Sequence, residues 1–144
     1  MKKTKTAKPR AHGRAAGLRE LAEFARAARL QAFAPFSRFK VGAALRTRTG
    51  EVVTGCNIEN ASYGLTMCAE RVAVFKAVSE GMRGFDAIAV VVDSPKLAAP
   101  CGPCRQILWE FCGDIWVRME NLRGRGVTRR MSELLPMAFD QGNL

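Results

Sequence analysis

The sequence predicts an α/β fold, a three-layer sandwich in which a mixed β-sheet carries helices on both faces. Strand patterns and helix patterns alternate along the chain, which favours layered α/β packing over a bundle or a β-sandwich. The run at 87–92 is apolar at every position, as expected for a strand that is buried on both faces. With 144 residues and 48% hydrophobic residues, the chain is long enough for one domain with one core.

The elements follow in a regular order. A helical spacing of apolar residues runs from Leu18 to Phe33 and ends before Pro35. Two strands, 39–45 and 51–56, flank a turn at Thr49 and Gly50 and predict a hairpin. After a polar loop at 57–66, the remaining elements are a helix at 68–78 ended by Gly81, a strand at 87–92, a helix at 101–111 begun by Pro100, a strand at 115–119 and a short helix at 132–135.

The formal charge of +10 is concentrated at the N-terminus. Residues 1–19 hold seven of the 23 basic residues and no acidic one, so the rest of the chain has 16 basic and 13 acidic residues, a net +3. We expect residues 1–15 to form a disordered, solvated tail and residues 16–144 to form the domain. Weak contact with nucleic acid, or a targeting role, is confined to this tail. His12 lies in it and has no expected catalytic part.

The cysteines favour a metal site in a reducing compartment. There are five of them, no secretory signal precedes them, and two form a C-x-x-C pair. No apolar stretch approaches the roughly 20 residues of a membrane span. We therefore expect a cytoplasmic protein without a membrane segment, in which Cys56 and Cys112 are small buried hydrophobic residues.

The remaining three cysteines have the spacing of a catalytic zinc site. Cys68 begins one predicted helix, while Cys101 and Cys104 share a face on the first turn of another. Helix N-termini favour thiolates, so two such ends can hold three ligands for one zinc ion. A structural zinc site needs a fourth protein ligand, whereas a hydrolytic site leaves one position open for water. No fourth Cys or His is well placed.

Glu70 lies two residues after Cys68 and supplies the acid/base that a hydrolytic site requires. Its carboxylate can take a proton from the activated water and pass it to a ring nitrogen and the departing ammonia. Arg71 can donate hydrogen bonds to the ligand sulfurs and offset the negative charge of three thiolates, although a surface salt bridge is an equally good reading of it. The combination is the signature of zinc-dependent nucleobase deaminases.

The chain as a whole resembles the small homotetrameric cytidine deaminases. The matching strings run from about Ala34 to Phe139 and include A-P-F-S-R-F-K-V-G-A-A-L, T-G-C-N-I-E-N-A-S-Y-G-L-T-M-C-A-E-R, F-K-A-V-S-E-G, P-C-G-P-C-R-Q and L-L-P-M-A-F. The resemblance implies a cytidine-deaminase-like sandwich and hydrolysis of cytidine and deoxycytidine to the uridines and ammonia in pyrimidine salvage. It also implies one zinc per subunit and a homotetramer with shared active sites.

The resemblance further implies roles for individual residues. Cys68, Cys101 and Cys104 bind zinc, and Glu70 is the catalytic proton shuttle. The other implied contacts are made to substrate. Asn57 and Glu59 hydrogen-bond the ribose hydroxyls, Phe39 packs near the nucleoside, and the backbone of Ala69 contacts the pyrimidine edge. Tyr63 and Phe139 reach into the site of a neighbouring subunit. Met137 departs from the family pattern, because a glycine is expected at this place, and Trp116 to Asn121 is more polar than the family's usual apolar strand.

Three alternatives stay open from the sequence. Two are enzymes: a deaminase for a modified cytosine nucleoside, and an RNA editor recruited through residues 1–19. The third is a non-catalytic zinc module whose tail binds nucleic acid, with steeply salt-dependent affinity. Glu59 argues for a free nucleoside, since a carboxylate that accepts from a 3′-hydroxyl would repel the phosphate found there in a polynucleotide.

Overall fold

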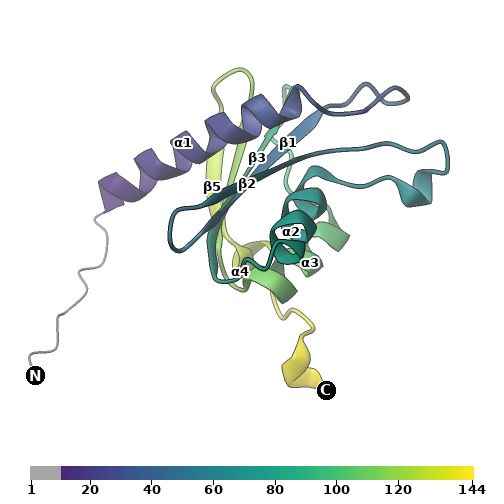
Figure 1. Cartoon of the computed structure of the whole chain (residues 1–144). Coiled ribbons are helices and arrows are strands. Elements are labelled where there is room, and N and C mark those ends of the chain that lie inside the picture. The colour runs from purple at the N-terminus through teal and green to yellow at the C-terminus, as the bar shows by residue number, and fades with distance from the viewer. Residues whose placement is uncertain (1–10) are drawn as a thin grey trace, which may run out of the picture.

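The structure, a computed structural model, describes residues 11–144 (Figure 1). Its strands are β1 (Val41–Thr47), β2 (Val52–Cys56), β3 (Phe85–Val92), β4 (Trp116–Asn121) and β5 (Gly126–Arg130). Its α-helices are α1 (Ala11–Arg29), α2 (Ala69–Ser79), α3 (Gly102–Cys112) and α4 (Met131–Leu134), and the 3-10 turns are η1 (Tyr63–Leu65) and η2 (Gln141–Asn143). Within this part of the chain, no helix is both long and apolar enough to cross a bilayer.

The five strands form one mixed sheet in the order β2-β1-β3-β4-β5. The β1–β2, β1–β3 and β4–β5 pairs are antiparallel, while β3 and β4 are parallel and connected through α3. The carboxyl ends of β3 and β4 consequently lie at the same edge. That edge is where open α/β sheets usually place their ligand sites.

Helices cover both faces of the sheet, which confirms the three-layer prediction (Figure 1). The central strand β3 shows why its whole run is apolar. Ile88 and Val90 pack into a core with α2 and α3, whereas Ala87, Ala89 and Val91 pack into a second core with α1. Alternate residues of one strand therefore fill two separate cores.

The α1 face is lined by small residues, so this helix lies close to the strands. Ala22 and Ala25 of α1 pack against Ala44 and the alanines of β3. At Gly42 the approach is closest, because a Cβ there would stand 1.9 Å from the backbone oxygen of Ala25. Any larger residue at position 42 would push α1 away from the sheet.

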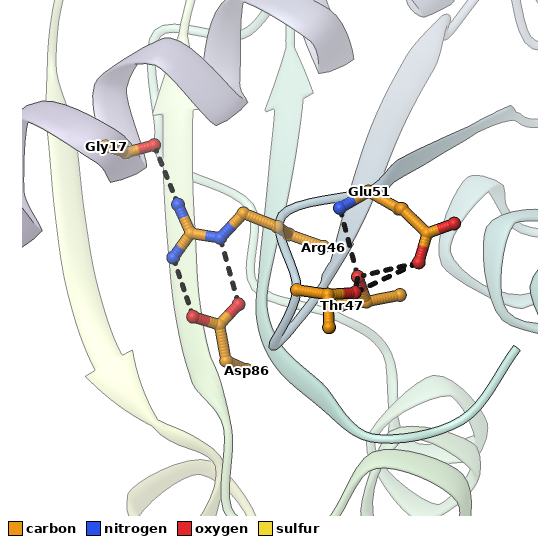
Figure 2. Close-up of polar contacts among 6 residues, drawn as sticks. Gly17, Arg46, Thr47, Glu51 and Asp86 are labelled. Atoms are coloured by element: carbon orange, nitrogen blue, oxygen red, sulfur yellow. Dashed lines mark hydrogen bonds and ion pairs between the residues drawn. The ribbon is translucent and has the colours of Figure 1, made fainter. Parts of the chain in front are cut away.

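Arg46 of β1 joins three elements through its guanidinium. Figure 2 shows its two parallel hydrogen bonds, both 2.9 Å long, to the carboxylate of Asp86 on β3, and a third of 3.3 Å to the backbone oxygen of Gly17 on α1. A two-pronged arginine–carboxylate contact fixes geometry better than a single ion pair. Nearby, Thr47 and Glu51 close the β1–β2 hairpin.

The polar character of β4 has a structural cause. Val117 and Met119 face the α2–α3 core, while Arg118 and Glu120 point to the opposite face. There, Glu120 lies 2.7 Å from the Arg118 guanidinium and 3.7 Å from that of Arg26 on α1. The alternation of an apolar set with an ion-paired set accounts for a buried strand that is polar in sequence.

The sequence prediction was wrong at two places. It omitted β5, whose residues are mostly polar and which pairs only with β4 at the edge of the sheet. It also extended the first helix to Phe33, whereas α1 ends at Arg29 and Phe33 forms a bridge with Ile58. Residues 1–10 of the predicted tail lie outside the described residues, so this part stays a prediction, whereas residues 11–15 belong to α1.

Gly55 of β2 determines how α2 sits on the sheet. A Cβ at this position would lie 2.5 Å from the backbone oxygen of Ala69 and 2.6 Å from the backbone nitrogen of Ala73. Both are helix backbone atoms, which cannot rotate away as a flexible side chain would. The absence of a side chain at Gly55 thus lets the first turns of α2 rest directly on β2.

We expect Gly55→Ala to lower the free energy of unfolding by about 1–3 kcal/mol, because the added methyl group displaces α2. Gly64→Ala is the matched control, since a Cβ there would have no neighbour within 4 Å. Urea unfolding of both variants measures the difference. Equal stability of the two variants would contradict the close approach of α2 to β2.

Candidate active site

Three cysteine thiols meet where α2 and α3 begin. Cys68 is the N-cap of α2 and Cys101 is the N-cap of α3, and neither side chain caps its own helix by a hydrogen bond. Cys104, on the first turn of α3, is fully buried. All three sulfur atoms lie within 4.8 Å of one another, and those of Cys68 and Cys101 are 3.9 Å apart.

This geometry fits zinc. Tetrahedral zinc with sulfur at about 2.3 Å requires ligand sulfurs roughly 3.8 Å apart. Among the described residues, these three form the one group of cysteine, histidine or carboxylate side chains able to hold a metal ion. They leave the fourth tetrahedral position without a protein ligand, as a catalytic zinc site requires.

The charge distribution favours a thiolate at Cys68. A hydrogen bond from Cys104, followed by the bond from Arg71, lowers the pKa of Cys68 to about 5. The same hydrogen bond raises the pKa of Cys104. Arg71 donates from Nη2 to the sulfur of Cys68 at 3.4 Å and to the backbone oxygen of Thr66 at 3.4 Å. The guanidinium therefore contacts a metal-site sulfur, and a surface salt bridge is excluded.

Glu70 is buried beside the thiols, with 5% of its surface exposed. Burial raises the pKa of this carboxyl to about 7, with a further increase from the negative charge of Cys68. A carboxyl with a pKa near neutrality can both accept and return a proton at low energetic cost. Its neighbour Ala69 is fully buried on the first turn of α2.

A cavity of about 190 Å³ opens in front of these groups. The wall nearest the thiols is formed by Cys68, Ala69, Glu70 and Cys101. Apolar residues that include Val41, Val90 and Ala98 form much of the remainder. Phe39 and Asn57 also line it. Six of the residues predicted from the sequence therefore surround one cavity, with Cys104 buried behind it.

A larger hollow of about 540 Å³ lies at the opposite end of the sheet. Four of its five charged residues form ion pairs, Arg46 with Asp86 and Arg130 with Asp114, and the fifth is Arg48. It contains neither the thiol cluster nor Glu70. The larger hollow thus lacks the residues expected to act in catalysis, and the smaller cavity, which has them, is the candidate active site.

Asn57 and Glu59 organise the segment that carries Phe39. The side chain of Asn57 donates to the backbone oxygen of Phe39 at 2.7 Å and accepts from the backbone nitrogen of Val41 at 2.8 Å. Glu59 accepts from the backbone nitrogens of residues 36 and 37 and from the hydroxyl of Ser37. The Ser37 hydroxyl is the main cause that lowers the pKa of Glu59, so this carboxylate is ionised at neutral pH.

The structure separates the other predicted contacts from this cavity. Glu59 does not line it, and neither do Tyr63 and Phe139. Tyr63 is 70% exposed and packs edge-on against Phe36, with ring centroids 5.9 Å apart, while Phe139 is 60% exposed. Both aromatic rings thus remain open to solvent on this chain.

Two contributors were missed by residue-level reasoning. Ser37 holds Glu59, and the backbone oxygen of Thr66 holds Arg71. A single serine or threonine in a loop gives no periodic or spacing signal, and a backbone oxygen gives none at all. Only the folded geometry identifies them.

Met137, where a glycine was expected, has a positive φ of 53° and is fully exposed. This is the left-handed conformation that glycine adopts freely and that costs other residues about 1–2 kcal/mol. The chain therefore keeps the bend of a glycine despite carrying a side chain. The bend between α4 and Phe139 therefore carries a cost in conformational energy.

Comparisons with known proteins agree with this geometry. Residues 17–119 match the family model described as the cytidine and deoxycytidylate deaminase zinc-binding region. A cytidine deaminase from Sporosarcina psychrophila is 50% identical over 118 residues, which cover 81% of this chain and 87% of that protein. One from Halalkalibacterium halodurans is 56% identical over 113 residues, covering 78% and 86% of the two chains.

A solved structure shows the same fold. The crystal structure of cytidine deaminase from Burkholderia pseudomallei superposes with a TM-score of 0.82 at 49% sequence identity. The match covers 84% of this chain and 98% of that one. The matched family model spans the Cys68, Cys101 and Cys104 triad, so these residues form the zinc-binding region of the chain.

We expect the purified protein to hold about one zinc ion per chain and to lose it on Cys104→Ala. Cys112→Ala is the matched control: it lies on the same helix and is also buried, but burial raises the pKa of its thiol to about 12. Elemental analysis measures zinc in both variants. Retention of a full zinc ion by Cys104→Ala would exclude the three-thiol site.

Zinc removal should also destabilise the fold, because the ion joins α2 to α3. At a free zinc concentration a thousand times the dissociation constant, binding adds about 4 kcal/mol to the free energy of unfolding. A melting curve recorded with and without a chelator measures this term. An unchanged melting temperature after verified zinc loss would show that the thiols do not link the helices.

Proposed function

This chain belongs to the cytidine deaminase family, and on that premise we propose that it hydrolyses cytidine and deoxycytidine to uridine, deoxyuridine and ammonia. The observation that carries the proposal is Glu70, a buried carboxylate with a pKa near 7 that lines the same cavity as Cys68 and Cys101. A structural zinc site has no use for such a group. A hydrolase requires it.

Zinc held by the three thiolates supplies the Lewis acid that makes water nucleophilic near neutral pH. Glu70 carries the protons: it takes one from the attacking water, delivers it to a ring nitrogen of cytosine, and assists protonation of the departing ammonia. Water adds at C4 and the C4–N bond breaks, so the balance is cytidine plus water giving uridine plus ammonia. Burial of Glu70 suits it to this two-way transfer.

The rest of the cavity orients the nucleoside. The backbone of Ala69 faces the pyrimidine edge, and Phe39 packs against the nucleoside from the segment that Asn57 anchors. Precise placement of a bound substrate lowers the entropic part of the barrier. Arg71 donates a hydrogen bond to the sulfur of Cys68 and so stabilises this zinc ligand as a thiolate. Arg71 itself does not line the cavity.

In this proposal the ribose hydroxyls bind Asn57, which lines the cavity, and Glu59, which lies outside its lining in this structure. Glu59 is ionised, so it accepts from a free 3′-hydroxyl and repels a phosphate at that position. The favoured substrate is therefore a free nucleoside. Three reduced thiols within 4.8 Å of one another further support a cytoplasmic enzyme.

The active enzyme is a homotetramer with shared sites. Exposed apolar side chains gather on the segments 33–36 and 58–65, namely Phe33, Phe36, Ile58, Tyr63 and Leu65. The bridge between Phe33 and Ile58 brings these two segments together. A surface of this kind is typical of an interface, and in the proposed tetramer it meets another copy of the chain. Tyr63 and Phe139 then reach the substrate of that copy.

Glu70→Gln tests the reaction directly. We expect it to retain one zinc per chain and to lose at least a hundredfold in kcat, the usual scale of general acid/base catalysis. The decrease in cytidine absorbance measures turnover, and cytidine 5′-monophosphate and a cytidine-containing RNA serve as alternative substrates. Substantial cytidine turnover by this variant, or wild-type activity on RNA alone, would refute the proposal.

Shared sites predict complementation between two defective chains. Glu70→Gln lacks the proton carrier but has an intact Phe139, whereas Phe139→Ala has the reverse. When the two are co-refolded, mixed tetramers contain some sites with both residues intact, so activity should exceed the average of the separate variants. Strictly additive activity, with mixed assembly verified by native mass spectrometry, would show that each site belongs to one chain.

A further inference from the structure

The C-terminal arm, defined here as residues 136–144, is held by α3 through side chains. It is the yellow segment that leaves α4 in Figure 1 and ends at the C-terminus. Gln106 donates from Nε2 to the backbone oxygen of Phe139 at 2.8 Å. Trp109 donates from Nε1 to the carboxylate of Asp140 at 3.2 Å, and Gln141 donates to the carboxylate of Glu110 at 3.1 Å.

These contacts have a regular origin in the helix. Positions 106, 109 and 110 are spaced i, i+3 and i+4, so their side chains lie on one face of α3. Three successive residues of the arm, 139 to 141, meet this face in order. Asp140 also accepts from the backbone nitrogen of Gly142 at 2.9 Å, which closes the turn that follows.

The contacts fix the backbone around Phe139 and leave its ring free. Gln106 holds the main-chain oxygen of Phe139 and Trp109 holds the next side chain, yet Phe139 itself is 60% exposed. An arm that served only to cover α3 would turn its aromatic ring toward the helix. Here α3 holds the backbone of Phe139 by a hydrogen bond, and the Phe139 side chain stays largely exposed to solvent.

We propose that Gln106 and Trp109 are positioning residues that set where Phe139 enters the active site of a neighbouring chain. This inference rests on the proposed shared-site enzyme, because it assigns a means of delivery to an aromatic ring that acts in trans. Neither side chain lines the zinc cavity of its own chain. Their effect on the reaction passes through the arm.

The test is a variant that removes both donors, Gln106→Met combined with Trp109→Phe, in which the first change keeps the side-chain length and the second keeps an aromatic ring. We expect KM for cytidine to rise about tenfold, with zinc content, melting temperature and kcat close to those of the wild type. Trp116→Phe is the matched control: it shortens the other tryptophan, which lies under Arg130 on the sheet, and leaves the arm intact. Its KM should equal that of the wild type.

A double-mutant cycle with Phe139→Ala shows whether the effect passes through the ring. If the arm contacts act by placing Phe139, then removing them from the Phe139→Ala variant should raise KM no further. An equal further increase would overturn the inference, as would an unchanged KM for the combined Gln106 and Trp109 variant or for Phe139→Ala alone. If the combined variant folds poorly, Gln106→Met alone is judged by the same criteria.

Failure of the inference can be distinguished from failure of the proposed function. A wild-type protein without cytidine turnover would refute the function itself. An active wild type whose KM is insensitive to Gln106, Trp109 and Phe139 would leave the function standing and refute the positioning role. In mixed assemblies assayed at cytidine concentrations well below KM, adding the two α3 substitutions to the Glu70→Gln chain should lower the activity gained by complementing Phe139→Ala about tenfold, and undiminished complementation would refute delivery in trans.

Discussion

The site depends on the meeting of two helix N-termini. Cys68 and Cys101 are the N-caps of α2 and α3, so the two helix starts bring their sulfur atoms to one place, and the partial positive charge of a helix N-terminus favours anionic groups there. The meeting is possible because Gly55 lets α2 rest on the sheet without an intervening side chain. The position of Cys68, of the Glu70 carboxylate and of part of the cavity wall follows from the start of α2, and that of Cys101 and Cys104 follows from the start of α3.

The same arrangement explains how a carboxylate is kept buried beside sulfur ligands. Glu70 is nearly inaccessible and lies near the charge of Cys68, two conditions that favour its protonated form. Arg71 offsets part of this effect, since it is the neighbouring positive charge and it bonds the Cys68 sulfur. Cys68, Glu70 and Arg71 thus lie within four residues at the start of α2. The charge of Cys68 raises the pKa of Glu70, while Arg71 lowers the pKa of both Glu70 and Cys68.

The sequence was sufficient for those features that repeat or have fixed spacing. The all-apolar run at 87–92, the C-x-x-C pair and the Cys68–Glu70 interval each follow from helix or strand geometry, and the structure places them as predicted. It was insufficient where tertiary contacts decide. β5 forms because its backbone pairs with β4, not because its polar side chains favour a strand, and Ser37 and Thr66 act through hydrogen bonds that leave no pattern.

The role of α3 connects the chemistry to the assembly. Its first turn carries Cys101 and Cys104, and its later turns carry Gln106 and Trp109, which hold the arm. An 11-residue helix is about 16 Å long and rigid, so the arm keeps a fixed position relative to the zinc ligands of its own chain. In a closed symmetric oligomer every copy repeats this geometry. Each chain of the proposed tetramer therefore gives the ring of its Phe139 to a neighbour and receives a Phe139 ring in return, so the placement of this ring depends on α3 of the neighbouring chain.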